Sequence, residues 1–324
     1  MTSTVEHAFE AFVVEAAFLG ETAAFALGDG SLRLVAGGDE MRVPVHAGAI
    51  LSAAPAIDGR RIVTGGDDGI VAATDFGGAV ERLAERPRKW IDRVAAGPGG
   101  AVGFTTGRQV SVRLADGRER NLDLPRAAGG IAFAPKGLRL AIARYDGVTL
   151  WWPATDAEPT GLEWKGAHLA AAFSPDGKYV VTAMQDNALH GWRLADGKDM
   201  RMSGYPAKPR SISWSAKGRF LATSGANAAI LWPFHFKDGP MGKPPLQLGA
   251  REVLVTRVAC HPKQELVAVG YQDGMVLAVR FGDAEEAVIQ RPGAGPVSAL
   301  AWDGGGRRLA VGTEAGAAAV VSLD

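Results

Sequence analysis

Short apolar runs and tight turns alternate along the whole chain. Residues 169–192 show the pattern most clearly, with three apolar runs separated by a Gly-bearing turn and a second tight turn. Residues 131–152 and 212–232 repeat the same order. Such runs, bounded by Gly, Asp and Asn, predict short antiparallel strands joined by hairpins. An Asp-Gly turn at 116–117 or 196–197 leads into a further polar segment, so each unit supplies four strands.

The same order of apolar runs and turns recurs with a regular period. Weaker copies occupy 16–35, 51–75, 94–114, 258–280 and 300–322. The second turn returns at intervals between 39 residues, from Asp29 to Asp68, and 46 residues, from Asn227 to Asp273. A four-stranded unit repeating every ~40–45 residues is typical of a β-propeller blade. A solenoid of helix pairs would need apolar residues spaced by about 3.6, which these segments lack.

Composition agrees with a turn-rich β protein. The chain has 324 residues, of which 43 are Gly and 18 are Pro, and this disfavours long helical bundles. Hydrophobic residues make up 47%, enough for a large core. The single cysteine, Cys260, excludes a disulfide framework and a cysteine zinc site within the chain. The 35 basic and 35 acidic residues balance, which argues against a general polyanion binder.

In these repeated segments, the chain resembles the WD40-repeat family, in a degenerate and bacterial-type form. The resemblance extends over nearly its full length. The fit is clearest in the fifth unit, where four residues are similar to the family's buried His–Ser/Thr–Asp–Trp tetrad: His168, Thr182, Asp186 and Trp192. Three of these positions also match in the second unit, which has Thr74 where Trp is expected: His46, Thr64 and Asp68. The resemblance implies a structural hydrogen-bonded chain in these blades.

We therefore expect an all-β fold, a single β-propeller of four-stranded antiparallel blades spanning residues 1–324. Eight blades are expected and seven are the alternative. The expected units are 11–48, 49–88, 89–127, 128–166, 167–207, 208–253, 254–294, and 295–324 completed by 3–9. The last unit lacks an outer strand, so the N-terminal segment is expected to close the ring. A helix over residues 4–18 is the alternative, because Ala and Glu are frequent there.

Candidate chemistry is sparse. Cys260 and His261 are neighbours, but adjacent residues of a strand point to opposite faces, so they form a weak candidate for a nucleophile pair. Asp92 is the acidic residue noted near the start of an inner strand, and a hard metal ion would need several such groups. No motif of a hydrolase, P-loop or zinc protease occurs in its expected context. We expect no catalytic residue, no metal and no cofactor.

The topology implied by the resemblance gathers one set of loops on one face of the disc. These loops are rich in Arg, Tyr and Trp, which are frequent interface hot spots. The candidate binding residues are Trp90, Arg93, Arg144, Tyr145, Lys165, Gln185, Arg210, Arg257, Tyr271 and Gln272. The opposite face has one distinctive feature, a Pro-rich insertion at 233–246, which is the alternative site.

The expected function is a cytoplasmic, non-catalytic scaffold that binds a protein or peptide, and the basic loops favour an acidic segment. The alternatives are an enzyme or small-ligand binder that uses the central channel, and weak nucleic-acid binding through the basic loops. No membrane association is expected, because no apolar stretch of about 18 residues occurs. The first residues also lack the basic start of a signal peptide.

Overall fold

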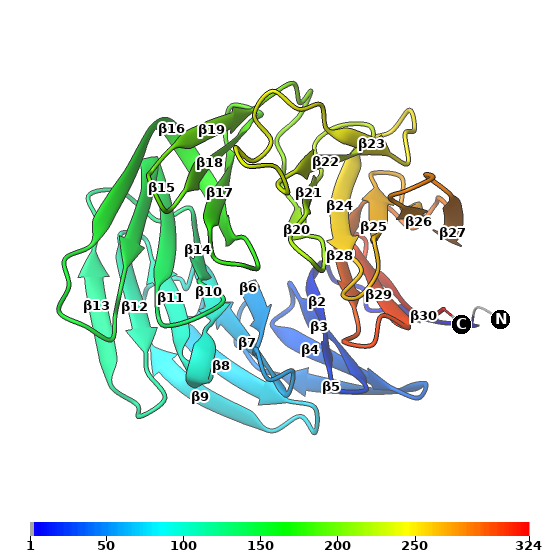
Figure 1. Cartoon of the computed structure of the whole chain (residues 1–324). Coiled ribbons are helices and arrows are strands. Elements are labelled where there is room, and N and C mark those ends of the chain that lie inside the picture. Colours follow the sequence, from blue (N-terminus) through cyan, green and yellow to red (C-terminus); the bar gives the residue numbers. More distant parts are fainter. Residues whose placement is uncertain (1–2, 324) are drawn as a thin grey trace.

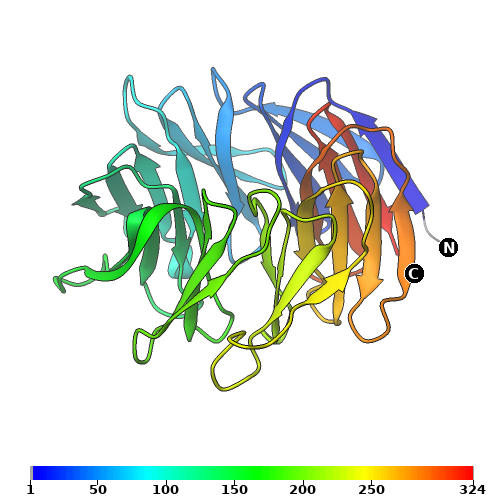
Figure 2. The same ribbon diagram turned by 90° about the horizontal axis from the view of Figure 1, so that it is seen from above.

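The computed structural model describes residues 3–323 as a ring of antiparallel β-sheets around a common axis (Figure 1). Within these residues there are 30 strands and one short 3-10 helix, η1 (Pro98–Gly100). In the four-stranded sheets, one edge strand lies nearest the axis and the other lies at the rim (Figure 1). Figure 2 shows the two termini at the same edge of the ring.

Six sheets have four strands each. The first three are β2 (Val13–Leu19), β3 (Thr22–Leu27), β4 (Ser31–Ala36) and β5 (Asp39–Pro44); β6 (Ile50–Pro55), β7 (Arg61–Gly66), β8 (Ile70–Asp75) and β9 (Val80–Glu85); and β10 (Arg93–Ala96), β11 (Val102–Thr106), β12 (Gln109–Arg113) and β13 (Glu119–Asp123). The next two are β20 (Ile212–Trp214), β21 (Phe220–Thr223), β22 (Ala229–Pro233) and β23 (Leu246–Leu248); and β24 (Val255–Cys260), β25 (Leu266–Tyr271), β26 (Val276–Arg280) and β27 (Glu286–Gln290). The sixth joins β28 (Val297–Trp302), β29 (Arg308–Thr313) and β30 (Ala317–Ser322) to β1 (Ser3–Ala8).

The seventh sheet has six strands. They are β14 (Gly130–Phe133), β15 (Leu140–Trp151), β16 (Thr160–Phe173), β17 (Tyr179–Met184), β18 (Leu189–Arg193) and β19 (Asp199–Met202). The first half of β16 pairs with β15 and its second half pairs with β17. One strand is therefore the outer strand of the fourth repeat unit and the inner strand of the fifth.

This shared strand corrects the blade count. Counted as continuous hydrogen-bonded sheets, the ring of the described residues has seven blades; the prediction of eight is wrong, and the seven-bladed alternative holds. The period along the sequence counts repeat units, and it cannot reveal whether the link between two units stays extended. Here the link at residues 165–167 remains part of β16 instead of forming a loop.

The N-terminal strand closes the ring, as predicted. β1 pairs with β30 in antiparallel register from Ser3 opposite Ser322 to Ala8 opposite Ala317. The helix considered for residues 4–18 does not form, because both β1 and β2 lie there as strands. An open edge on β30 would expose a row of unpaired backbone groups, and β1 covers it.

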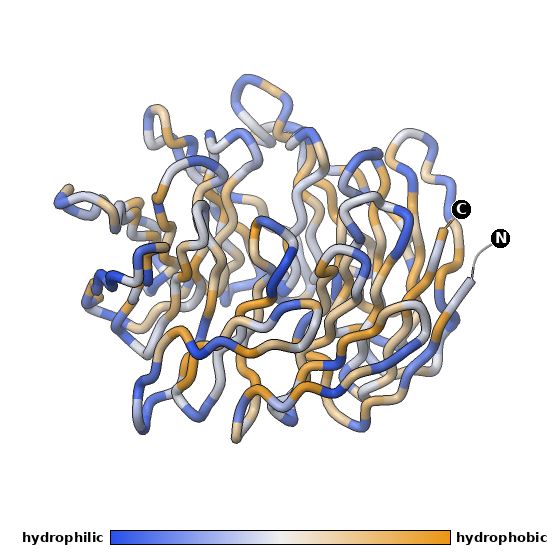
Figure 3. Tube along the Cα trace, turned by 90° about the horizontal axis from the view of Figure 1, so that it is seen from below, coloured by the Kyte–Doolittle hydropathy of each residue, from blue (hydrophilic) through white to orange (hydrophobic). Residues whose placement is uncertain are grey.

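The core lies between neighbouring sheets, and Figure 3 shows the hydrophobic segments along the strands and the hydrophilic ones at the loops. Large side chains such as Phe25, Phe104 and Trp192 are fully buried there. Burying each such side chain contributes about 1.5–3 kcal/mol. Glycines permit the closest approach between inner strands: a Cβ on Gly130 would lie 2.7 Å from the Cα of Ala170.

Polar side chains tie the inner strands of neighbouring sheets together. The Ser52 hydroxyl accepts from the Val94 amide at 3.1 Å, and the Ser211 hydroxyl accepts from the Val258 amide at 3.1 Å. Across the junction where the chain ends meet, the Ser298 hydroxyl donates to the Val13 carbonyl at 2.6 Å. These bonds hold the inner ends of the sheets at fixed spacing.

No helix among residues 3–323 has the length and apolar character needed to span a bilayer.

Removing residues 1–8 should lower the melting temperature and promote oligomers, because β30 would lose all six of its paired residues on β1. Thermal unfolding and size-exclusion chromatography measure both effects. A truncated protein that stays monomeric and melts with the full chain would contradict this account of ring closure.

Candidate functional site

In the fifth repeat unit, only part of the expected tetrad is hydrogen-bonded. The Nδ1 atom of His168 lies 2.7 Å from the Thr182 hydroxyl oxygen, and its Nε2 atom lies 3.0 Å from the Trp164 carbonyl oxygen. Burial lowers the pKa of His168, so the ring is neutral: Nε2 donates to Trp164 and Nδ1 accepts from Thr182. Asp186 takes no part, since its carboxylate accepts from exposed Arg201 at 3.0 Å.

Trp192 is buried beside this pair, with its ring centroid 5.7 Å from that of His168. The structure thus brings three of the four expected residues together and places Asp186 outside. The backbone carbonyl of Trp164, which precedes His168 in the chain, accepts the hydrogen bond from His168 Nε2.

The second repeat unit contains the more complete chain. His46 bonds through Nδ1 to Asp68 at 3.0 Å and through Nε2 to Thr64 at 2.8 Å. Asp68 also accepts from the amides of Ala47 and Ile70. Burial alone would raise the pKa of Asp68, but the bonds from Ile70, His46 and Ala47 outweigh it and lower the pKa.

A buried histidine lies next to the fifth unit's network. His190 is stacked on Trp164 with 3.9 Å between ring centroids, and its Nε2 atom lies 3.1 Å from Asp199, at an angle too poor for a hydrogen bond. Burial lowers the pKa of His190 to about 4, although Asp199 acts in the opposite direction. The sequence pattern marked this residue only as part of a strand.

Two tyrosines near the loop face are buried, and one of them was a predicted binding residue. Tyr271, a predicted binding residue, is 0% exposed, and its hydroxyl donates to the Gly249 carbonyl, so that assignment is wrong. Tyr205 occupies the place of the missing histidine in the sixth unit: its hydroxyl oxygen lies 2.7 Å from that of Thr223 and accepts from Trp232 Nε1 at 2.6 Å. Burial raises the pKa of Tyr205 to about 12.

Some of the remaining candidate side chains are exposed, and others already form hydrogen bonds or ion pairs within the protein. Trp90 and Tyr145 are 64% and 51% exposed. Four polar candidates are also exposed, namely Lys165, Gln185, Arg210 and Gln272. Three arginines are engaged by their own fold: Arg144 pairs with Glu163 at 2.5 Å, Arg93 donates to the Gly129 carbonyl at 2.9 Å, and Arg257 donates to the carbonyls of Ser298 and Arg210.

Two of the exposed candidates meet at a cavity of about 460 Å³, which we term the loop-face cavity. It is formed by the loops that precede β20, β24 and β28 and by the turns after β17, β21, β25 and β29. Its polar lining consists of Asn187, Lys208, Arg210, Ser224, Thr256, Gln272 and Glu314. Trp90 and Tyr145 are not among its lining residues.

The charges at this cavity are unbalanced. Among the described residues, no carboxylate lies within ion-pair distance of Lys208, Arg210 or Arg257. Burial raises the pKa of Glu15 on β2, and the charge of Arg257 opposes this effect. A polar residue within an apolar run gives no sign of such a long-range interaction, so the sequence did not reveal it.

Cys260 and His261 both have structural roles. Burial raises the pKa of Cys260 to about 12, so a thiolate is disfavoured at neutral pH. His261 accepts from the amides of Lys263 and Gln264 through Nδ1, and its Nε2 atom donates to the Gly306 carbonyl at 2.9 Å. Both ring nitrogens are therefore occupied in holding a turn against the next sheet.

Comparison with known proteins agrees with this geometry. The sequence pattern described as "WD domain, G-beta repeat" matches residues 38–72 and 166–193, the segments that contain His46 and His168. Two segments of this β-propeller thus match the WD40-repeat family. Over its whole length the propeller superposes on the crystal structure of the computationally designed protein Ika8, covering 98% of both chains with a TM-score of 0.79 at 16% identity.

Curated relatives are more distant in sequence. The propeller is 25% identical to "WD repeat-containing protein 55" of Pongo abelii over 216 residues, which cover 64% of this chain and 55% of the relative. It is 24% identical to a "Ribosome biogenesis protein WDR12 homolog" of Drosophila mojavensis over 127 residues, 37% of this chain and 30% of the relative. The chain spans about half the length of the first of these relatives. These relatives are eukaryotic and give no support to a bacterial-type origin.

Asp68→Ala should destabilise the propeller more than Asp186→Ala. The first change removes the partner of the Nδ1 atom of buried His46 and of two amides, at a cost of about 1–3 kcal/mol. The second removes an exposed ion pair worth about 0–1 kcal/mol. Urea denaturation of both variants compares their unfolding free energies, and equal losses would contradict the hydrogen bonding described for Asp68.

The propeller should lose stability as the pH falls from about 6.5 to about 4. Over this range an unfolded His190 binds a proton that the folded one, with its pKa of about 4, does not, so protons favour unfolding. His190→Phe keeps a ring against Trp164 and removes the titration. Its unfolding free energy, measured at several pH values, should fall less steeply than that of the unmodified chain; parallel curves would exclude His190 as a source of acid sensitivity.

Proposed function

We propose that this propeller is a non-catalytic cytoplasmic scaffold that binds an acidic protein or peptide segment at the loop-face cavity. The observation that carries the proposal is the group of cations with no carboxylate in ion-pair distance among the described residues: Lys208, Arg210 and Arg257. WD40 repeats are typically found in protein-interaction scaffolds, which supports a protein partner.

The geometry supports recognition of a carboxylate. The Arg257 side chain donates to the carbonyl of Arg210, so it is held next to the cavity before any ligand arrives. Charge-assisted hydrogen bonds from such a preorganised guanidinium are about twice as strong as neutral ones. Ser224, Thr256 and Gln272 add neutral polar groups to the same lining.

Exposed aromatic residues extend this face. Trp90 lies in the loop between β9 and β10, and Tyr145 ends the first half of β15, where Asp146 adopts a φ of 64°. Aromatic anchors of this kind often dominate the energetics of protein interfaces. A partner that spans several sheets could use them in addition to the cavity.

The alternatives have less support. The roles of Cys260 and His261 in packing leave neither as a free nucleophile or base. Nucleic-acid binding depends on a basic excess, whereas basic and acidic residues of this chain are equal in number.

The test is to pan a random peptide library on the immobilised protein and on a Lys208→Glu, Arg210→Glu double variant. Arg60→Glu, Arg118→Glu serves as the matched control, since both of these arginines are exposed on turns of the opposite face. Acidic peptides should be enriched on the unmodified protein and on the control, and lost on the double variant. Their affinity should fall as salt rises.

The proposal would be overturned if no acidic peptides were enriched, or if the acidic peptides bound all three proteins equally. If binding survives the double variant but is lost when residues 236–245 are deleted, the partner uses the insertion between β22 and β23 instead.

A further inference from the structure

Four of the inner strands end in an aromatic residue. Phe133 on β14 pairs with Leu140, Phe173 on β16 with Val180, Trp214 on β20 with Leu221, and Trp302 on β28 with Leu309. The four residues thus occupy one register position in four repeat units. We call them the wedge aromatics.

Each wedge aromatic packs between its own repeat unit and the preceding one. Phe133 packs in the cluster of Val110, Val112 and Leu122 from the preceding sheet. Trp302 packs with Ala268 and Val276, and its Nε1 atom donates to the Ala259 carbonyl at 2.9 Å. Gaps between radiating sheets widen toward the rim, and a large ring is the side chain that closes them.

The third repeat unit has no wedge aromatic. Ala96 on β10 pairs with Val102 and so stands at the same register position. Beside it lies a cleft of about 530 Å³ between the second and third sheets. Its apolar lining includes Val63, Ala73 and Leu83, and the last two lie 39 residues before Val112 and Leu122, which pack with Phe133.

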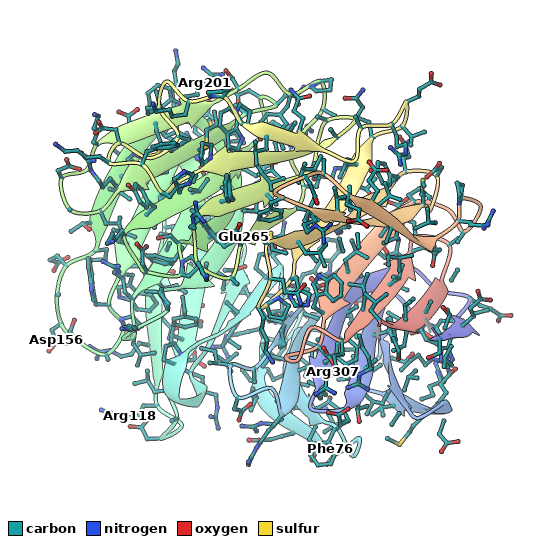
Figure 4. The ribbon with its side chains drawn as sticks, turned by 45° about the vertical axis from the view of Figure 1, so that its right-hand side comes forward. Phe76, Arg118, Asp156, Arg201, Glu265 and Arg307 are labelled. Atoms are coloured by element: carbon teal, nitrogen blue, oxygen red, sulfur yellow. The ribbon has the colours of Figure 1, made fainter. Side chains whose placement is uncertain are left out.

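The cleft is open on the side opposite the loop face. Gly99 and Gly100 border it with φ values of 67° and 80°, and neither carries a side chain that could cover it. Ile57 at its border is 66% exposed. Figure 4 shows Phe76 and Arg118, on turns of the two flanking sheets, along one edge of the molecule.

We propose that this cleft binds an aromatic side chain, Trp or Phe, of a partner protein, which supplies the missing wedge. The occupant is inferred from the chain itself, because the equivalent spaces of the fourth, fifth, sixth and eighth units hold Phe or Trp. The volume also lies in the range of pockets that enclose small organic groups. An apolar cavity of this kind can take up a free aromatic molecule.

Charge plays a minor part at this cleft. At its mouth, Arg61 is already paired with Glu81 at 2.9 Å, and Asp58 and Arg113 balance each other in sign. Recognition here is therefore apolar, in contrast to the cationic loop-face cavity, and this proposal does not rest on the function proposed above. The Arg61–Glu81 pair offers polar groups to the backbone on either side of the inserted ring.

The first test uses N-acetyl-tryptophanamide as the probe and N-acetyl-alaninamide as its control, with binding followed by NMR shifts of residues at the cleft. The unmodified protein should bind the tryptophan probe and not the alanine one. Ala96→Trp and Ala96→Phe should raise the melting temperature by filling the cleft and weaken probe binding at least tenfold. Phe133→Ala is the matched reverse variant: it should lower the melting temperature and open a second probe site between the third and fourth units.

The second test separates a protein partner from a free small molecule. Peptides from a random library should be enriched in Trp or Phe on the unmodified protein, lost on Ala96→Phe, and retained on the Lys208→Glu, Arg210→Glu variant. A lower melting temperature for both Ala96 variants, with unchanged probe binding, would overturn the cleft as the site. Probe binding without enrichment of any aromatic peptide that depends on Ala96 would overturn the assignment of a protein partner.

Discussion

Closure of the ring is the constraint on which the rest of the structure depends. Seven sheets can radiate from one axis only if the last meets the first, and two contacts accomplish this: β1 pairs with β30, and Ser298 bonds to Val13. Related bonds from Ser52 and Ser211 hold the other inner strands at matching distances. Once the inner edges are held, the wedge between neighbouring sheets must be filled, and this determines where large side chains are needed.

The same constraint explains why the repeats tolerate so much change. The second, fifth and sixth units each have a buried polar link to a threonine, and different residue types make it. His46 bonds to Thr64 and Asp68, whereas Tyr205 bonds to Thr223 and Trp232. Since a hydroxyl and an imidazole can both satisfy a threonine, repeats can diverge in sequence while the sheets stay in register.

The two binding surfaces that we propose use residues that ring closure does not require. Lys208 and Arg210 are not needed to hold the sheets together through their side chains, and they line the loop-face cavity. Ala96 is smaller than the residue that packing would favour, and a cleft results. The two surfaces differ in chemistry, one cationic and one apolar, and a rigid disc can present both at once.

The sequence by itself determined the strands, the repeat units and the closure by residues 3–8, because turn residues and apolar runs act locally and the period counts whole units. The resemblance to the WD40-repeat family also placed His46 with Thr64 and Asp68. Only the tertiary structure decided that β16 joins two units, that Tyr271 is buried, that Asp186 turns to Arg201, and that Glu15 influences Arg257. Each of these depends on contacts between residues that no local pattern relates, and such contacts exist only once the ring has closed.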